Sequence, residues 1–163
     1  MPNQIIDKSA YLDYNYSITE LWEDIMKTCT FFGHSDAPHD LRSAIKGKIT
    51  ALIEQHGVEL FYVGNHGQFD SMVRSLLKEL AATYPIGYSV VLAYFPNERT
   101  AEENTLLPEG IELCHPKGAI DFRNKWMLER SDYVITYVTR SWGGAAKYKK
   151  AALKCKKTVI ELS

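Results

Sequence analysis

A glycine-bearing stretch at residues 141–147, Ser-Trp-Gly-Gly-Ala-Ala-Lys, has the residue types that bind an anion. Residues 132–138 before it are rich in β-branched and aromatic side chains, which predicts a buried strand, and the Ala- and Lys-rich residues 148–154 favour a helix. Two glycines between a strand and a helix let the backbone approach a phosphate, whose charge the free N–H groups and dipole of the helix start stabilise. A tight turn that uses glycine only for its geometry is the alternative.

Two other turns with small or polar residues are expected at the same edge of the fold. Gly33-His34-Ser35 ends a predicted strand at residues 27–32, and residues 64–70 follow a second predicted strand at 58–63. In parallel α/β sheets, ligands bind beyond the carboxyl ends of the strands, where the strand order reverses. We therefore expect these turns and the glycine-bearing stretch to form one anion or nucleotide pocket. The long connection 95–110 either closes over that pocket as a flap or lies in solvent as a plain loop.

Strands and helices alternate along the chain. Other segments are predicted as strands at 88–94, 111–114 and 158–162, and as helices at 40–56, 69–84 and 117–130. This order predicts an α/β fold, a single Rossmann-like three-layer domain with a mostly parallel sheet over residues 27–163. Residues 1–26 show no clear period and predict a short N-terminal arm, in which residues 17–20 fit the capping box of a short helix.

Composition and charge exclude several classes of protein. The 163 residues carry a formal net charge of −1, so no general basic field exists to grip duplex nucleic acid. No apolar run approaches the roughly 20 residues of a membrane span, and residues 1–16 lack the order of a signal peptide, so we expect a cytoplasmic protein. The three cysteines form no CxxC pair, which argues against a disulfide framework and a metal site. The GxGxxG and P-loop motifs are absent, so no dinucleotide cofactor and no P-loop ATP hydrolysis are expected.

Several side chains near these turns have both a functional and a structural interpretation. His34 could donate to a phosphate, act as a base, or only hydrogen-bond its turn. Asp70 could bind a ribose hydroxyl or only stabilise a helix dipole. Arg123, beside Asn124, offers a fork for phosphate or carboxylate, against an ordinary surface ion pair. Trp142 could stack on a base or pack on a neighbouring subunit. The complete set of predicted ligand-binding residues is Gly33, His34, Ser35, Gly64, Asn65, Gly67, Gln68, Asp70, Arg123, Asn124, Ser141, Trp142, Gly143, Gly144 and Lys147.

Taken in order, five short motifs resemble those of the SLOG superfamily. They lie at residues 30–34 (TFFGH), 62–70 (YVGNHGQFD), 123–127 (RNKWM), 131–132 (SD) and 141–147 (SWGGAAK). Within the superfamily the chain is most similar to the small YpsA-like proteins of Firmicutes and their phages, over about residues 27–163. The resemblance implies a Rossmann-like fold that binds nucleotides or nucleotide-derived signals such as ADP-ribose derivatives.

The same superfamily includes the LOG phosphoribohydrolases, whose motif PGGxGTxxE carries a catalytic glutamate. Aligned on Gly143-Gly144, this chain has Trp142 at the proline, Lys147 at the threonine and Lys150 at the glutamate. A lysine cannot stabilise positive charge on a leaving ribose, because its own charge has the wrong sign. The resemblance therefore favours a binding protein, a sensor, carrier or sequestering protein for a small nucleotide-derived ligand, rather than an enzyme. We also expect this protein to be a homo-oligomer. A nucleotide-processing hydrolase and an oligomeric interaction protein with a vestigial pocket are the alternatives.

Overall fold

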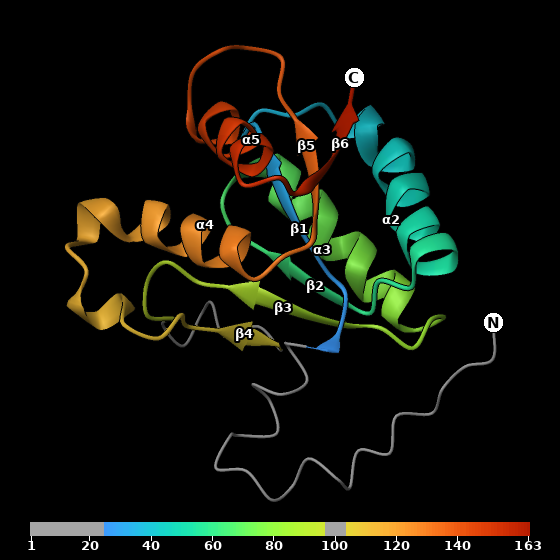
Figure 1. The fold of residues 1–163 in the computed structure, drawn as a ribbon, viewed down its shortest axis with the longest axis horizontal. Helices are drawn as coiled ribbons and strands as arrows, with labels where there is room; N and C mark the ends of the chain where they lie inside the picture. Colours follow the sequence, from blue (N-terminus) through green and yellow to red (C-terminus); the bar gives the residue numbers. More distant parts are fainter. Residues whose placement is uncertain (1–24, 97–103) are drawn as a thin grey trace, which may run out of the picture.

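Six parallel strands form the centre of the protein (Figure 1). The structure is a computed structural model that describes residues 25–96 and 104–163. The strands stand in the order β4-β3-β2-β1-β5-β6, so the chain runs from β1 to one edge and then returns to the other side of β1. Their bounds are β1 (Thr28–Gly33), β2 (Leu60–Val63), β3 (Gly87–Val91), β4 (Thr105–Leu106), β5 (Tyr133–Tyr137) and β6 (Thr158–Leu162).

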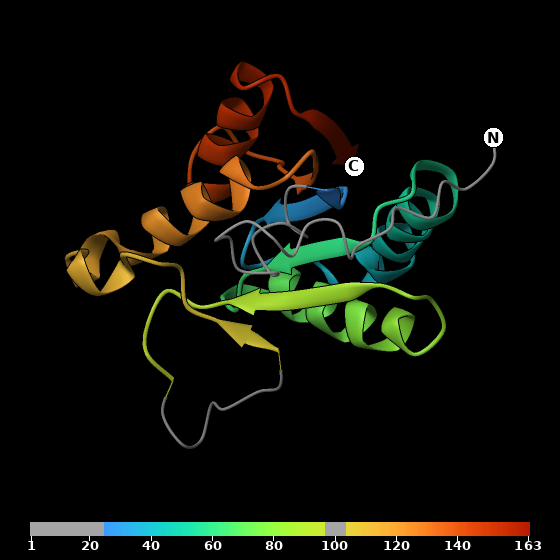
Figure 2. The same ribbon diagram turned by 60° about the horizontal axis from the view of Figure 1, so that its bottom comes forward.

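Helices cover both faces of this sheet and complete three layers (Figure 2). One face carries α2 (Arg42–His56) and α3 (Gly67–Ala81), which contact each other. The other carries α4 (Ala119–Glu129) and α5 (Gly144–Lys154), which also contact each other. The described residues thus confirm the predicted α/β class, a single Rossmann-like three-layer domain, with a sheet that is parallel at every pairing. None of the described helices is long and apolar enough to cross a membrane.

Each face of the sheet has its own hydrophobic core because successive strand side chains point to opposite faces. In β1, Phe31 packs into the core under α2 and α3, while the adjacent Phe32 packs into the core under α4 and α5. Helix α3 buries an apolar stripe that runs from Phe69 to Leu80, at the spacing of a helix that covers a sheet. The register places Phe32 of β1 beside Thr136 of β5, near the carboxyl ends of both strands.

One predicted strand is wrong. Residues 111–114 were expected to form a fourth strand, but Ile111–Leu113 forms the 3-10 helix η3, and the next turn, Pro116–Gly118, forms η4. The edge of β3 is already paired with β4, and the left-handed Gly110 (φ 88°) turns the chain away from the sheet. Only Ile111 of this segment is buried. The short apolar pattern therefore reflects one buried residue and not the buried face of a strand.

Two sequence-based predictions fall outside the described residues. Of the predicted N-terminal arm at residues 1–26, residues 1–24 lie outside the described part of the chain. The centre of the predicted flap, residues 97–103, also lies outside them. On either side of that centre, residues 95 and 96 follow β3, and residue 104 leads into β4.

Candidate functional site

A cleft of about 310 Å³ opens at the carboxyl ends of β1 and β5. These two neighbouring strands are where the chain changes direction across the sheet, since β2 lies on one side of the pair and β6 on the other. Open parallel sheets bind ligands at this position. Residues that line the cleft come from both strand ends and from α3, α4 and α5: Phe31, Phe32, Gly33, His34, Ser35, His66, Asp70, Ile120, Arg123, Asn124, Met127, Arg140, Trp142, Gly143, Gly144 and Ala145.

The glycine turn after β5 leads directly into a helix start without a side-chain cap. Gly143 has φ 94°, a left-handed backbone conformation that residues with a Cβ rarely adopt. Helix α5 begins at the next residue, and no side chain caps its first turn. The first N–H groups of a helix have no partner within it. A Cβ built on Gly144 meets no atom within 4 Å outside its own helix and chain neighbours, so the space beside this residue is open.

His34 connects the turn after β1 to the turn after β5. Its ring is buried, and its Nε2 accepts a hydrogen bond from the backbone N–H of Thr139 at 3.0 Å. An accepting Nε2 belongs to the neutral ring, and burial, with the nearby positive charge of Arg140, lowers the pKa of His34. His34 thus makes a structural hydrogen bond, but to the backbone that leads into the glycine turn rather than to its own turn, and it also lines the cleft.

A second contact joins the turn after β1 to the start of α3. The N–H of Gln68 donates to the carbonyl oxygen of Ser35 at 2.8 Å. Gly67 has φ 87°, and a Cβ placed on it would lie 2.5 Å from Cα of Ser35. Gly67 and Gln68 thus hold two loops together but do not line the cleft. Glycine is required at position 67 for this close approach of two backbones.

Arg123 of α4 crosses the cleft wall and reaches the loop after β2. Only 3% of the residue is exposed. Its Nε donates to Oδ1 of Asn124 at 3.0 Å, and its Nη1 lies 3.3 Å from Oδ1 of Asn65 and 3.2 Å from Nδ1 of His66. Since arginine only donates, Nδ1 of His66 is the acceptor in this contact. Helix α4 and the loop after β2 are thereby fixed to each other.

Asp70 lies in the same wall and is 8% exposed. Its Oδ2 accepts a hydrogen bond from the N–H of His66 at 3.0 Å. A Cβ on Gly64 would lie 2.6 Å from Oδ2 of Asp70 and 2.9 Å from Nη1 of Arg123, so glycine at that position leaves room for both groups. Burial raises the pKa of Asp70 to about 6, although the positive charge of Arg123 opposes the rise.

Lys147 does not line the cleft. Its Nζ forms an ion pair with Oδ1 of Asp121, which also accepts a hydrogen bond from the hydroxyl of Tyr148 at 2.6 Å. These contacts join α5 to α4, and the ammonium group of Lys147 is paired with Asp121 instead of facing the glycine turn. Lys150, which the sequence resemblance aligned with the LOG glutamate, is exposed on α5.

The structure brings nine of the predicted ligand-binding residues to the cleft: Gly33, His34, Ser35, Asp70, Arg123, Asn124, Trp142, Gly143 and Gly144. Gly64 and Asn65 do not line the cleft but contact Arg123. Gly64 leaves room for its guanidinium, and Oδ1 of Asn65 accepts a hydrogen bond from its Nη1. Gly67, Gln68, Ser141 and Lys147 are not among the residues that line it.

His66 and Arg140 line the cleft but were missing from that prediction. His66 lies inside the second motif, between two residues that were included, and Arg140 directly precedes the glycine-bearing stretch. Their positions beside predicted ligand-binding residues could therefore have identified both as lining residues. The apolar lining residues Phe31 and Met127 gave no such signal, because they follow the ordinary pattern of core-facing strands and helices.

Comparisons of this chain with family models, with curated proteins and with solved structures found no match. Within the described residues, no group of three or more His, Cys, Asp or Glu side chains is placed to hold a metal ion. The chemistry of the cleft therefore has to be judged from its own residues, which are two arginines, one buried carboxyl, two histidines with lowered pKa values and an uncapped helix start.

Proposed function

We propose that this protein binds a small nucleotide or a nucleotide-derived ligand of the ADP-ribose type, as a sensor, carrier or sequestering protein. One observation carries the proposal: the start of α5, at Gly143 and Gly144, has no side-chain cap and lines the cleft. This cleft lies where the strand order of the parallel sheet reverses. Backbone N–H groups at such a helix start suit phosphate oxygens. The resemblance of the sequence motifs to the SLOG superfamily agrees with this class of ligand.

The charges and rings of the cleft support the same class. Arg123 of α4 and Arg140, which follows β5, both line it, and Asp70 is the only Asp or Glu in its described lining. The indole of Trp142 is exposed over 67% of its surface at the glycine turn, where a nucleobase could stack on it. A phosphorylated ligand with a planar base would use all of these groups.

A nucleotide-processing hydrolase is the second candidate, and Asp70 is the observation that favours it. A carboxyl group with a pKa of about 6 in a cleft is suited to general acid–base catalysis near neutral pH. The position of the LOG glutamate, however, is Lys150, which is exposed and does not line the cleft. We therefore place binding first and hydrolysis second.

The first test identifies the ligand. The purified protein is heated, and mass spectrometry of the released small molecules is followed by thermal unfolding with a panel of nucleotides. A ligand at 100 times its Kd should stabilise the fold by about 2.7 kcal/mol. Recovery of the ligand unaltered after long incubation supports binding, whereas appearance of a free base or ribose phosphate supports the hydrolase.

A matched pair of variants tests the position of the phosphate. Gly144→Asp places a carboxylate at the start of α5, where it stabilises the helix dipole but repels an anion, and Gly144→Asn has nearly the same shape without the charge. Because no atom lies within 4 Å of the new Cβ, both variants should fold. We expect Gly144→Asp to lose binding by about tenfold or more and Gly144→Asn to lose far less. Unchanged binding in a folded Gly144→Asp would show that the ligand does not bind at the start of α5, whereas no binding by the wild type to any nucleotide of the panel would favour the oligomeric protein with a vestigial pocket.

A further inference from the structure

Arg140 is held at the cleft with one of its donors unused. The side chain is 29% exposed, and its Nε is buried without a hydrogen-bond partner in the described part of the chain. A buried donor left unpaired costs stability, so its persistence calls for an explanation. Arg140 lines the same cleft as Gly143 and Gly144 and precedes the start of α5 by only four residues.

Two neighbours hold the guanidinium of Arg140 in place. Its Cζ lies over the Trp142 ring, 4.4 Å from the ring centre, in the position of a cation–π contact. Its Nη1 donates to both oxygens of Asp36, at 3.0 and 3.2 Å. Asp36 follows the turn after β1, and 67% of its side chain is exposed, so this ion pair spans the two strand ends in contact with water.

We propose that Arg140 binds the ligand's phosphate and that Asp36 is an internal competitor for the same guanidinium. The inference rests on the proposed function. It adds Arg140 as a binding residue and Asp36 as a carboxylate that lowers the affinity for phosphate by pairing with Arg140. A phosphate at the glycine turn would take the hydrogen bonds that Asp36 now receives from Nη1. Once released from Asp36, the guanidinium would turn so that Nε, now buried, also donates to the phosphate. Arginine suits this exchange because its planar fork matches phosphate and carboxylate alike.

The competition has a quantitative consequence. An exposed ion pair contributes little to stability, because water solvates both partners, so Asp36 should lower phosphate affinity only slightly. Removing Arg140 should have the larger effect, because a charge-assisted hydrogen bond to phosphate is lost. The effect of Asp36 must also disappear when Arg140 is absent, which a general repulsion between Asp36 and the ligand would not predict.

Isothermal titration with inorganic pyrophosphate tests the proposal on the full chain. We expect Asp36→Asn to bind about two- to fivefold more tightly than the wild type. Arg140→Gln should bind about tenfold or more weakly, and Arg140→Lys, which keeps the charge but has no Nε donor, should fall between. In Asp36→Asn/Arg140→Gln the gain from the Asp36 change should vanish. Circular dichroism confirms that each variant is folded.

Trp142 provides an independent readout. Because its ring packs on Arg140, pyrophosphate should change the tryptophan fluorescence of the wild type, and this change should be missing from Trp142→Phe. Wild-type affinity in a folded Arg140→Gln, with binding lost in Gly144→Asp, would overturn this inference and leave the proposed function standing. An equal gain from Asp36→Asn with and without Arg140 would overturn the competition. Absence of pyrophosphate binding by both the wild type and Asp36→Asn would overturn the inference, and the nucleotide panel would then decide the proposed function.

Discussion

At the scale of single residues, Asp70 and Arg123 place opposite charges in a wall that excludes most solvent. Both are largely buried, and the glycine at position 64 is what allows their polar atoms to lie against the backbone there. The backbone N–H of His66 and the charge of Arg123 stabilise the carboxylate of Asp70, but desolvation outweighs them and raises its pKa to about 6. Proton uptake in this wall is therefore linked to folding.

The pH dependence of stability checks this linkage. Because the pKa of Asp70 is higher in the folded protein than its ordinary value of 3.8, the folded state binds the proton more tightly, and its contribution to stability falls as pH rises from about 4 to about 6. The loss is on the order of 2–3 kcal/mol. We expect Asp70→Asn to remove this decrease in stability between about pH 4 and pH 6. Denaturant unfolding at several pH values across that range measures the free energy of unfolding of both proteins.

The matched control for Asp70 is Asp36→Asn. The hydrogen bond from Arg140 holds the pKa of Asp36 below its usual value, so the stability that Asp36 contributes is lost as pH decreases, the opposite direction. Identical pH profiles for the wild type and Asp70→Asn, or a carboxyl titration of Asp70 near pH 4 by NMR, would contradict the prediction.

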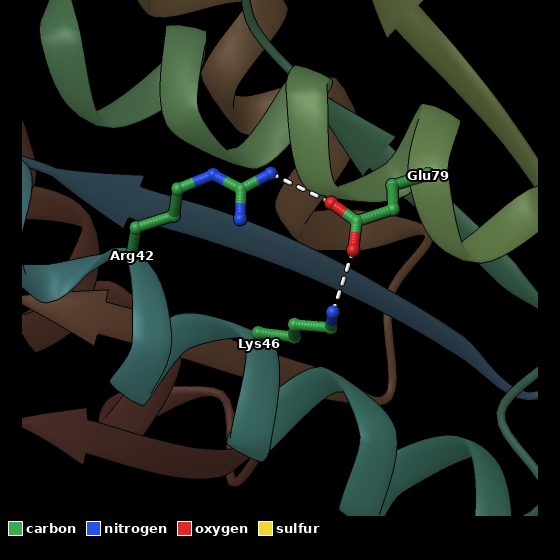
Figure 3. Close-up of polar contacts among 3 residues, drawn as sticks. All are labelled: Arg42, Lys46 and Glu79. Atoms are coloured by element: carbon green, nitrogen blue, oxygen red, sulfur yellow. Dashed lines mark hydrogen bonds and ion pairs between the residues drawn. The ribbon is translucent and has the colours of Figure 1, made fainter.

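At the scale of elements, a single carboxylate joins the two helices on one face of the sheet (Figure 3). Glu79 of α3 accepts from Nη2 of Arg42 at 2.7 Å and from Nζ of Lys46 at 2.5 Å, both on α2. The hydrogen bonds from Lys46 and Arg42 lower the pKa of Glu79 to about 2. Arg42 and Lys46 lie one turn apart, which is why one carboxylate reaches both.

Glu79→Gln is expected to destabilise the protein slightly at neutral pH. The three side chains are more than two-fifths exposed, so water and salt screen the attraction. Because the pKa is lowered, the stabilisation is present above the ordinary value of 4.5 and is lost as pH falls toward 2. Urea unfolding at neutral and acidic pH, at low and high salt, measures the difference. Glu112→Gln is the control, since Glu112 makes no ion pair within the described residues; an equal effect there would refute the role of Glu79.

At the scale of the whole molecule, the two hydrophobic cores share one sheet, so unfolding on one face should remove support from the other. Leu76 of α3 belongs to the core on one side and Leu128 of α4 to the core on the other. Both leucines are buried, and they provide the same substitution on opposite faces.

Leu76→Ala and Leu128→Ala should each lower the free energy of unfolding by about 2–5 kcal/mol, because each leaves a cavity in a packed core. We expect one cooperative transition in both variants, observed alike by far-UV circular dichroism and by tryptophan fluorescence. Separate transitions with the two probes in either variant would show that the two faces unfold independently.

Much of the architecture could be predicted from local patterns. The apolar stripe of α3 and the β-branched run of β5 each identify an element with the face that it buries, and the alternation of elements indicates a parallel sheet. The failure at Ile111 has the same origin, because a short apolar pattern cannot report whether a strand edge is still unpaired. Tertiary pairing decided that the neighbouring Thr105–Leu106 would occupy the edge of β3.

The amino-acid sequence by itself determined the alternation of strands and helices, the apolar face of elements such as α3, and that glycine turns follow several strands. Only the tertiary structure decided which polar groups meet: His34 accepts from Thr139, Lys147 pairs with Asp121, and Arg140 joins the cleft. The reason is physical. Backbone preferences and side-chain periodicity act over a few neighbouring residues, whereas a hydrogen bond between groups on different strands depends on how whole helices and strands pack.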